Sequence, residues 1–210
     1  MPRLATFVLT ILWAPAMQSS PPFLAPPGAG IPLLQRLALR YLFKPLKLRA
    51  MTFDEAERLW LAANAKLIKE LGEIPRFDVT TRVLVPPQRG LEDSSRFWSI
   101  AMTARHLTIV GAGIEQLIVG LSEGRTDLPS ADTAAVKPEL ERNHSAAIDE
   151  YLNFSRDFHT RLRSSVANKE SAATHPHPWF GAMNLRQWYW LMSTHTQIHR
   201  KQIREICKQP

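Results

Sequence analysis

Four segments of this 210-residue chain repeat their apolar residues with a helical period, and loops rich in proline and glycine separate them. Three of the segments cover about residues 52–72, 95–121 and 139–166, and the last starts at Asn184. Pro75, Pro86 and Pro87 exclude a continuous helix between the first two. Because each apolar stripe has to be buried against another helix, the sequence predicts an all-α fold, a four-helix bundle.

Residues with capping chemistry mark the starts of two of these helices. Thr52-Phe-Asp-Glu55 has the pattern of a capping box, and Gly72 is expected to close the first helix. Asn184-Leu-Arg-Gln187 has asparagine at the N-cap and glutamine three residues later, which predicts the start of the fourth helix. The loop after the first helix is expected to contain an extended piece at residues 83–85, and residues 124–138 form a second loop.

The fourth helix carries His195 and His199, which are four residues apart and therefore lie on one face. Two explanations fit a pair of inward histidines, namely hydrogen bonds to neighbouring helices or a bound divalent metal. Thr196 follows His195, so the glutamate of the H-E-x-x-H zinc proteases is missing and that class is disfavoured. The same face holds Gln202 and the apolar residues of the helix, which predicts that both imidazoles point inward. These apolar residues are Trp188, Leu191, Met192, Ile198, Ile203 and Ile206.

A catalytic zinc ion takes three protein ligands and keeps one position open, so a further donor is needed. His106 lies in the most apolar helical segment of the chain and is expected to be buried there, which makes it the natural third ligand. The other candidates are weaker, because they lie at or beyond the edge of a core face, in a rigid proline-rich loop or past the last helical turn: His144, His159, His175, His177 and Cys207.

With His106 on the second helix, the histidine pair on the fourth and His177-Pro-Trp-Phe-Gly181 before it, residues 51–208 resemble the DinB/YfiT-like superfamily. The name denotes damage-inducible helical-bundle proteins and not the DNA polymerase with the same label. The resemblance implies an up-down-down-up bundle with a zinc or nickel ion on His106, His195 and His199. It also implies a metal-dependent enzyme, such as an S-transferase or isomerase that presents mycothiol, bacillithiol or glutathione as a thiolate.

Under this hypothesis the metal activates a low-molecular-weight thiol or water for reaction with a small-molecule substrate. No general base stands out, since Glu115 lies two to three turns beyond His106 and Gln202 can only form hydrogen bonds. The alternative is a non-catalytic bundle in which a metal with a fourth protein ligand pins two helices, or in which the histidines bond each other.

Other residues near the histidines have a structural and a functional interpretation. Arg105 and Arg200 flank the ligands, and we expect them at a solvated helix edge in preference to a site for a substrate carboxylate. Trp98, Trp188 and Trp190 are expected in the core in preference to a pocket lining.

The net charge of +7 is concentrated near the N-terminus. Residues 1–50 carry a charge of +6 with no acidic residue, whereas the remainder carries +1. A nearly neutral bundle has no phosphate-binding footprint, and no zinc-finger, RNP or helix-turn-helix pattern occurs, so nucleic-acid binding is not expected. We divide the chain into an N-terminal extension, residues 1–50, and a bundle domain, residues 51–210.

Residues 31–50 of the extension form a basic amphipathic stretch, interrupted at Pro45. Its leucines are expected to pack on the bundle with the basic face solvated, and weak contact with an anionic membrane surface is the alternative. Residues 4–13, followed by Ala14-Pro-Ala16, resemble a short signal peptide, although a start called too far upstream explains them equally well. We expect a cytoplasmic location, with export or membrane association as the alternative. A homodimer is a possible assembly of the chain.

Overall fold

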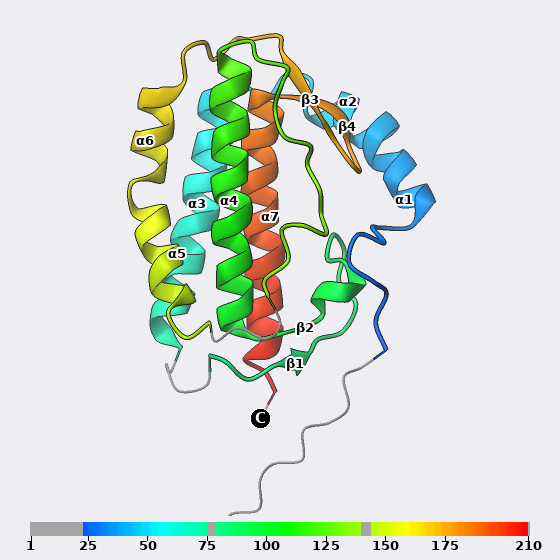
Figure 1. Ribbon diagram of the computed structural model, residues 1–210, viewed down its shortest axis with the longest axis vertical. Coiled ribbons are helices and arrows are strands. Elements are labelled where there is room, and N and C mark those ends of the chain that lie inside the picture. Colours follow the sequence, from blue (N-terminus) through cyan, green and yellow to red (C-terminus); the bar gives the residue numbers. More distant parts are fainter. Residues whose placement is uncertain (1–22, 75–78, 140–143, 210) are drawn as a thin grey trace, which may run out of the picture.

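The computed structural model describes residues 23–74, 79–139 and 144–209 (Figure 1). In Figure 1 the first and last helices of the bundle run downward and the two between them run upward, which is the up-down-down-up order seen from the other end. The predicted all-α bundle is therefore confirmed. The signal-like residues 4–13 lie outside the described residues. The bundle consists of α3 (Phe53–Glu73), α4 (Ile100–Ser122), the consecutive α5 (Ala147–Arg156) and α6 (Phe158–Ser165), and α7 (Leu185–Ile206).

Shorter elements surround the bundle at both ends. An antiparallel pair at the lower end joins β1 (Val83–Leu84) to β2 (Phe97–Trp98), next to the short 3-10 helix η3 (Asp93–Ser95), and so confirms the predicted extended piece. At the upper end β3 (Thr174–His177) and β4 (Gly181–Asn184) form a hairpin where the sequence predicts a rigid loop. The hairpin leads directly into α7 and thereby fixes where the histidine helix begins.

Both predicted helix caps are present. The Thr52 hydroxyl accepts a hydrogen bond from the backbone N–H of Glu55 at 3.1 Å. At α7 the Gln187 N–H donates to Asn184 Oδ1 at 3.0 Å, and the Asn184 N–H donates to Gln187 Oε1 at 3.3 Å. These bonds satisfy N–H groups that have no partner inside a helix. The predicted stop at Gly72 is slightly early, because α3 continues to Glu73.

The second helix begins at Ile100, later than the predicted start near Ser95. Phe97 and Trp98 are drawn into β2, where they lie opposite Leu84 and Val83. Ser99 then caps α4 by accepting a hydrogen bond from the Met102 N–H at 3.1 Å.

The third helix differs more from its prediction over residues 139–166. Its described part starts at Ala147, and it breaks at Asp157, whose φ of −111° and ψ of 7° are not helical. Ser155 precedes the break and its hydroxyl donates to the Leu152 carbonyl at 3.2 Å. Serine and aspartate offer the backbone such local alternatives to helical bonding, which explains the interruption.

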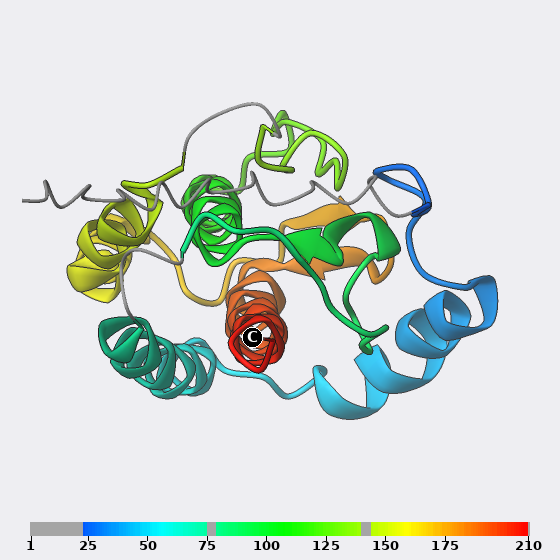
Figure 2. The same ribbon diagram turned by 90° about the horizontal axis from the view of Figure 1, so that it is seen from below.

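The N-terminal arm, residues 33–47, comprises α1 (Leu33–Ala38), the π-helical η1 (Leu39–Phe43) and α2 (Lys44–Lys47). The predicted interruption at Pro45 is absent: this proline lies in the first turn of α2, and the helical turns continue through it from η1. The expectation that the leucines of residues 31–50 pack on the bundle is wrong for most of them. Leu39 and Phe43 pack against the core and Leu48, just after the arm, is buried, whereas the other leucines of the stretch are exposed. Figure 2 shows the arm on the opposite side of α7 from α5.

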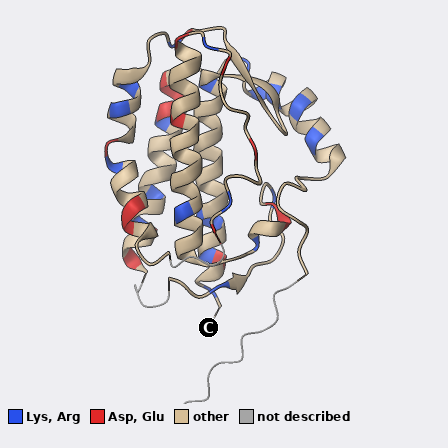
Figure 3. Ribbon diagram, in the orientation of Figure 1, with Lys and Arg blue, Asp and Glu red and all other residues tan. Residues whose placement is uncertain are grey.

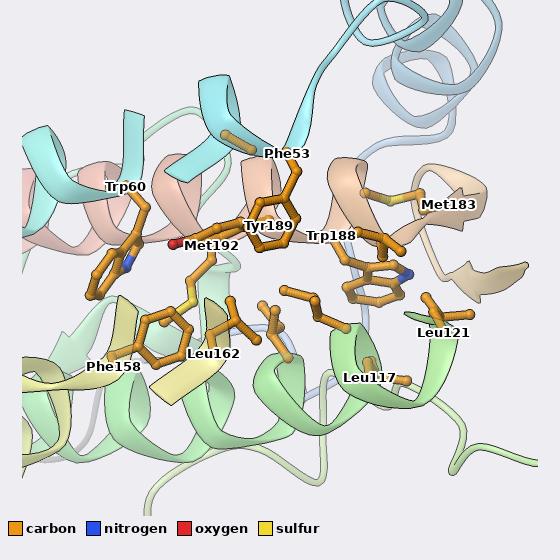
Figure 4. Close-up of a cluster of buried hydrophobic side chains, with 14 of the residues drawn as sticks. Phe53, Trp60, Leu117, Leu121, Phe158, Leu162, Met183, Trp188, Tyr189 and Met192 are labelled. Carbon is orange, nitrogen blue, oxygen red and sulfur yellow. The ribbon is translucent and has the colours of Figure 1, made fainter. Parts of the chain in front are cut away.

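The upper core is built around aromatic rings from three helices (Figure 4). Trp60 of α3 and Phe158 of α6 have ring centroids 4.5 Å apart, and Tyr189 of α7 lies 6.2 Å from Phe158. All three side chains are fully buried. A second apolar cluster near the lower end includes Leu67 and Ile203. Helix α7 contributes to both clusters and is therefore the central element of the bundle.

Helices α4 and α5 approach each other closely at Gly111. A Cβ atom there would lie 2.7 Å from the Phe154 ring, whereas a Cβ at Gly113 would meet nothing within 4 Å. Alanine stabilises a helix interior by about 1 kcal/mol relative to glycine, and overpacking costs about 1–3 kcal/mol.

We therefore expect Gly113→Ala to raise the free energy of unfolding by about 1 kcal/mol and Gly111→Ala to lower it by about 1–2 kcal/mol. Urea titration followed by circular dichroism measures both. Equal effects of the two substitutions would contradict the close approach of Phe154.

Candidate metal centre

The structure brings together His106 of α4 with His195 and His199 of α7. The Nε2 atom of His195 lies 3.1 Å from Nε2 of His106 and 3.1 Å from Nε2 of His199. One ring nitrogen from each of the three side chains falls within 4.8 Å of the others. Within the described part of the chain, no further histidine, cysteine or carboxylate joins this cluster.

Two of the rings are oriented by hydrogen bonds at their other nitrogen. His106 Nδ1 is 2.7 Å from the Val136 carbonyl oxygen, which can only accept, so Nδ1 carries the proton. His199 Nδ1 is 2.8 Å from Gln202 Oε1, while the Gln202 amide nitrogen donates to the Ser95 carbonyl at 2.7 Å. The second contact fixes the orientation of the Gln202 amide. In their neutral forms both histidines therefore present an unprotonated Nε2 to the cluster.

His195 cannot satisfy both neighbours with a single proton. If its Nε2 carries the proton, it can donate to only one ring, and the unprotonated Nε2 of the other ring is left 3.1 Å away without a donor. A cation at the centre removes this conflict. Nitrogen ligands about 2.0–2.1 Å from a tetrahedral zinc ion lie about 3.3 Å apart, close to the two distances seen here. The three side chains thus fit a divalent metal.

Burial keeps these imidazoles uncharged at neutral pH. Desolvation lowers the pKa of His106 and of His195 well below the usual histidine value, and the neighbouring histidines lower both further. Desolvation also lowers the pKa of His199, to about 4, against the opposing effect of the Gln202 hydrogen bond. Neutral imidazole is the form that binds metal, so little proton competition is expected at pH 7.

A tryptophan and a buried ion pair adjoin the cluster. The Trp98 ring stacks on His199 with centroids 6.0 Å apart and meets His106 edge-on at 5.0 Å. Lys137 Nζ lies 5.3 Å from the centre of the Trp98 ring and 2.6 Å from Glu92 Oε2. Burial lowers the pKa of Lys137, although its pairing with Glu92 opposes this. The other oxygen of Glu92 is buried and forms no hydrogen bond within the described structure.

A cavity of about 790 Å³ opens beside the histidines. Its lining is mostly apolar, with the arm on one side, residues 128–137 on another and the turn of the β3–β4 hairpin at one end. Gly113 of α4 and Trp190 of α7 also line it. A volume of this size accommodates an organic molecule as well as water.

The weaker histidine candidates lie away from the cluster. His144 is buried, with Nε2 2.7 Å from the Glu139 carbonyl oxygen, and His159 is half-exposed on α6. His175 is buried in β3 against Trp188, and Cys207 is exposed after the last turn of α7. His177 lines the cavity, and its Nδ1 accepts from the Trp179 N–H at 3.0 Å, which agrees with the expected loop hydrogen bonding.

The charged candidates are paired with other helices. Arg200 forms two hydrogen bonds to Glu70 of α3, and Arg105 pairs with Glu150 of α5 at 3.3 Å. Glu115 binds Arg161 of α6 at 2.7 Å and 3.0 Å. None of the three lies near the histidine nitrogens as a base or substrate anchor, whereas the predicted hydrogen-bonding role of Gln202 is confirmed.

No sequence pattern predicts that Val136, Lys137 and Glu92 lie beside the histidine cluster or its cavity. All three lie in the long loops before and after α4, where no periodic pattern assigns a direction to a side chain. The predicted core position of Trp98 is confirmed, and this ring also stacks on His199 and meets His106 edge-on.

Comparison with known proteins shows the family to which the chain belongs. A sequence model of the DinB superfamily matches residues 34–203. The chain belongs to the DinB superfamily. Among solved structures, this DinB-superfamily chain is similar to TT2238, described as a four-helix bundle protein, with a TM-score of 0.50 and 21% identity over 73% of this chain and 98% of that one. An uncharacterised protein from Escherichia coli UTI89 has a TM-score of 0.41 and 17% identity, covering 75% and 94% of the two chains.

The likeness to TT2238 supports the four-helix bundle of this DinB-superfamily member and carries no statement about activity. No curated protein matches the chain.

The half-buried His177 makes stability depend on pH. Burial lowers its pKa to about 4, so between pH 6.5 and 4 the unfolded chain binds a proton that the folded chain does not. Acidification in this range therefore lowers the free energy of unfolding by up to about 1.4 kcal/mol per pH unit for this group. In His177→Asn, where the amide oxygen can replace Nδ1 as acceptor, we expect a correspondingly shallower pH dependence.

Urea unfolding of the wild type and the variant at pH 7, 6 and 5 measures this difference, with His159→Asn as a control for the loss of a histidine. Identical slopes for the wild type and His177→Asn would show that the His177 ring does not resist protonation.

Proposed function

We propose that this protein is a metal-dependent enzyme of the DinB superfamily, in which His106, His195 and His199 hold zinc or nickel beside a pocket for a small organic substrate. The observation that carries the proposal is the meeting of three Nε2 atoms, two of them fixed as unprotonated, at the wall of the cavity. A divalent metal bound there lowers the pKa of a thiol or water that occupies its open position.

The protein's own residues have three tasks in this proposal. Val136 and Gln202 hold the rings of His106 and His199 in the tautomer that ligates. Trp98 covers two of the rings and excludes water from that side. The apolar cavity binds the organic part of the substrate and orients it toward the histidines.

The structure also contains a candidate proton acceptor. Glu92 lines the cavity with one buried carboxylate oxygen that is free of hydrogen bonds within the described structure. Its other oxygen is held by Lys137, which fixes the carboxylate in place. We assign Glu92 the role of accepting a hydrogen bond from the nucleophile or the substrate.

The competing function is a non-catalytic metal site that ties α4 to α7. A structural zinc site normally has four protein ligands. The described residues supply three, and all three line the cavity. This arrangement favours the enzyme over the purely structural site.

Metal content tests the ligand assignment. We expect protein purified without a histidine tag to hold close to one zinc or nickel per chain, and His106→Ala, His195→Ala or His199→Ala to lose most of it, because two imidazoles remain. His175→Ala and His177→Ala serve as matched controls that keep the metal. Mass spectrometry for metals measures all six proteins, and full retention in the three ligand variants would refute the site.

A thiol co-substrate is tested with the Co²⁺-loaded protein. Addition of glutathione is expected to produce a sulfur-to-cobalt charge-transfer absorption in the near ultraviolet. Gly113→Trp places a large side chain in the open space of the cavity, so we expect at least about ten-fold weaker glutathione binding with metal content unchanged. Gly113→Ala is the control. A Co²⁺ spectrum that no thiol alters would leave water as the nucleophile and reject the S-transferase class.

A further inference from the structure

The N-terminal arm, residues 33–47, exposes apolar side chains along its outer face. Among the described residues, large exposed hydrophobic side chains are rare outside this arm. The ones that lie elsewhere are Phe23, Leu61 and Leu84. Leu34 is 80% exposed and Leu46 is 77% exposed. The exposed set consists of Leu33, Leu34, Leu37, Tyr41, Leu42 and Leu46.

The arm is held to the bundle by its other side. Lys44 Nζ donates to the backbone carbonyls of Phe180 and Ala182, and Arg40 donates to the Pro178 carbonyl at 3.4 Å. Gln35, Ala38, Leu39 and Phe43 line the cavity. Since the inner face already closes the pocket, the outer leucines do not serve the bundle, and an apolar face of this kind marks an interaction surface.

The charges around this face indicate its partner. Arg36, Lys47 and Arg49 are exposed beside the leucines, and the first 53 residues contain no acidic side chain. Figure 3 shows the arm with basic bands and no acidic ones. In a symmetric dimer through this face, the basic residues of one copy would face those of the other, which opposes association. An anionic surface neutralises them.

The dimensions of the arm agree with a helix that lies flat on a surface. Its 15 residues extend over about 22 Å, shorter than the hydrocarbon thickness of a bilayer. None of the described helices combines the length and the apolar character needed to cross a membrane.

From this juxtaposition we propose that the outer face of α1, η1 and α2 docks on anionic lipid bilayers, with the leucines in the interface and Arg36, Lys47 and Arg49 on the headgroups. The proposal is independent of the metal and of any catalytic activity. It assigns a role to the one apolar face of the described fold that the bundle leaves uncovered.

Sedimentation of the full chain with vesicles tests the proposal. Vesicles of phosphatidylcholine with a fraction of phosphatidylglycerol are expected to bind the protein at low salt, and binding should fall at high salt and on pure phosphatidylcholine. Replacing Arg36, Lys47 and Arg49 by Gln is expected to lower the vesicle–water partition coefficient about a hundred-fold, because each cation contributes a factor of roughly five. Leu34→Ser with Leu42→Ser lowers it by at least about ten-fold.

Leu61→Ser with Leu84→Ser is the matched control, because these leucines are exposed on α3 and β1, away from the arm. This control should bind vesicles like the wild type, and thermal unfolding should show all variants folded. Absence of binding to phosphatidylglycerol vesicles, or an equal loss in the control, would overturn the proposal. So would a dimer in light scattering that the Leu34 and Leu42 changes convert to a monomer while vesicle binding persists.

Discussion

The close approach of three imidazole nitrogens is the constraint on which the arrangement of this bundle depends. It requires α4 and α7 to lie at one separation and in one rotation, so that His106 faces His195 and His199. The hydrogen bonds that orient the rings connect further segments to this centre. His106 is bonded to the Val136 carbonyl in the loop after α4, and Gln202 donates to the Ser95 carbonyl, which precedes α4. The centre therefore organises the loops as well as the helices.

The parts of this architecture that were predictable from sequence are those written in local periodicity. Asn184 and Gln187 define the start of α7 through bonds between neighbours, and these need no knowledge of the fold. The spacing of His195 and His199 and the apolar surroundings of His106 give their orientation, because a helix converts sequence distance directly into direction. Membership of the DinB superfamily over residues 34–203 agrees with the resemblance based on these histidines.

What could not be predicted depends on contacts between distant segments. Trp98 contacts the histidines from a two-residue strand, and Lys137, paired with Glu92, lies against Trp98 from a loop. The paths of these segments are set by tertiary packing. The leucines of the arm repeat like a core stripe and so predict burial, yet Lys44 and Arg40 donate to carbonyl groups of the β3–β4 hairpin, which turns these two basic side chains inward and leaves most of the leucines outside. Helical periodicity identifies a face but not the surface that covers it.

The Val136 carbonyl has a thermodynamic consequence. It orients His106 from within the segment of residues 128–137 that also lines the cavity, so one stretch of backbone contacts both the histidine cluster and the cavity. If the histidines hold a metal ion as proposed, a molecule that fills the cavity and holds this segment in place would raise their affinity for that ion. By linkage, the ion would raise the affinity for that molecule by the same factor. The segment would thus make binding of the proposed ion and of that molecule cooperative.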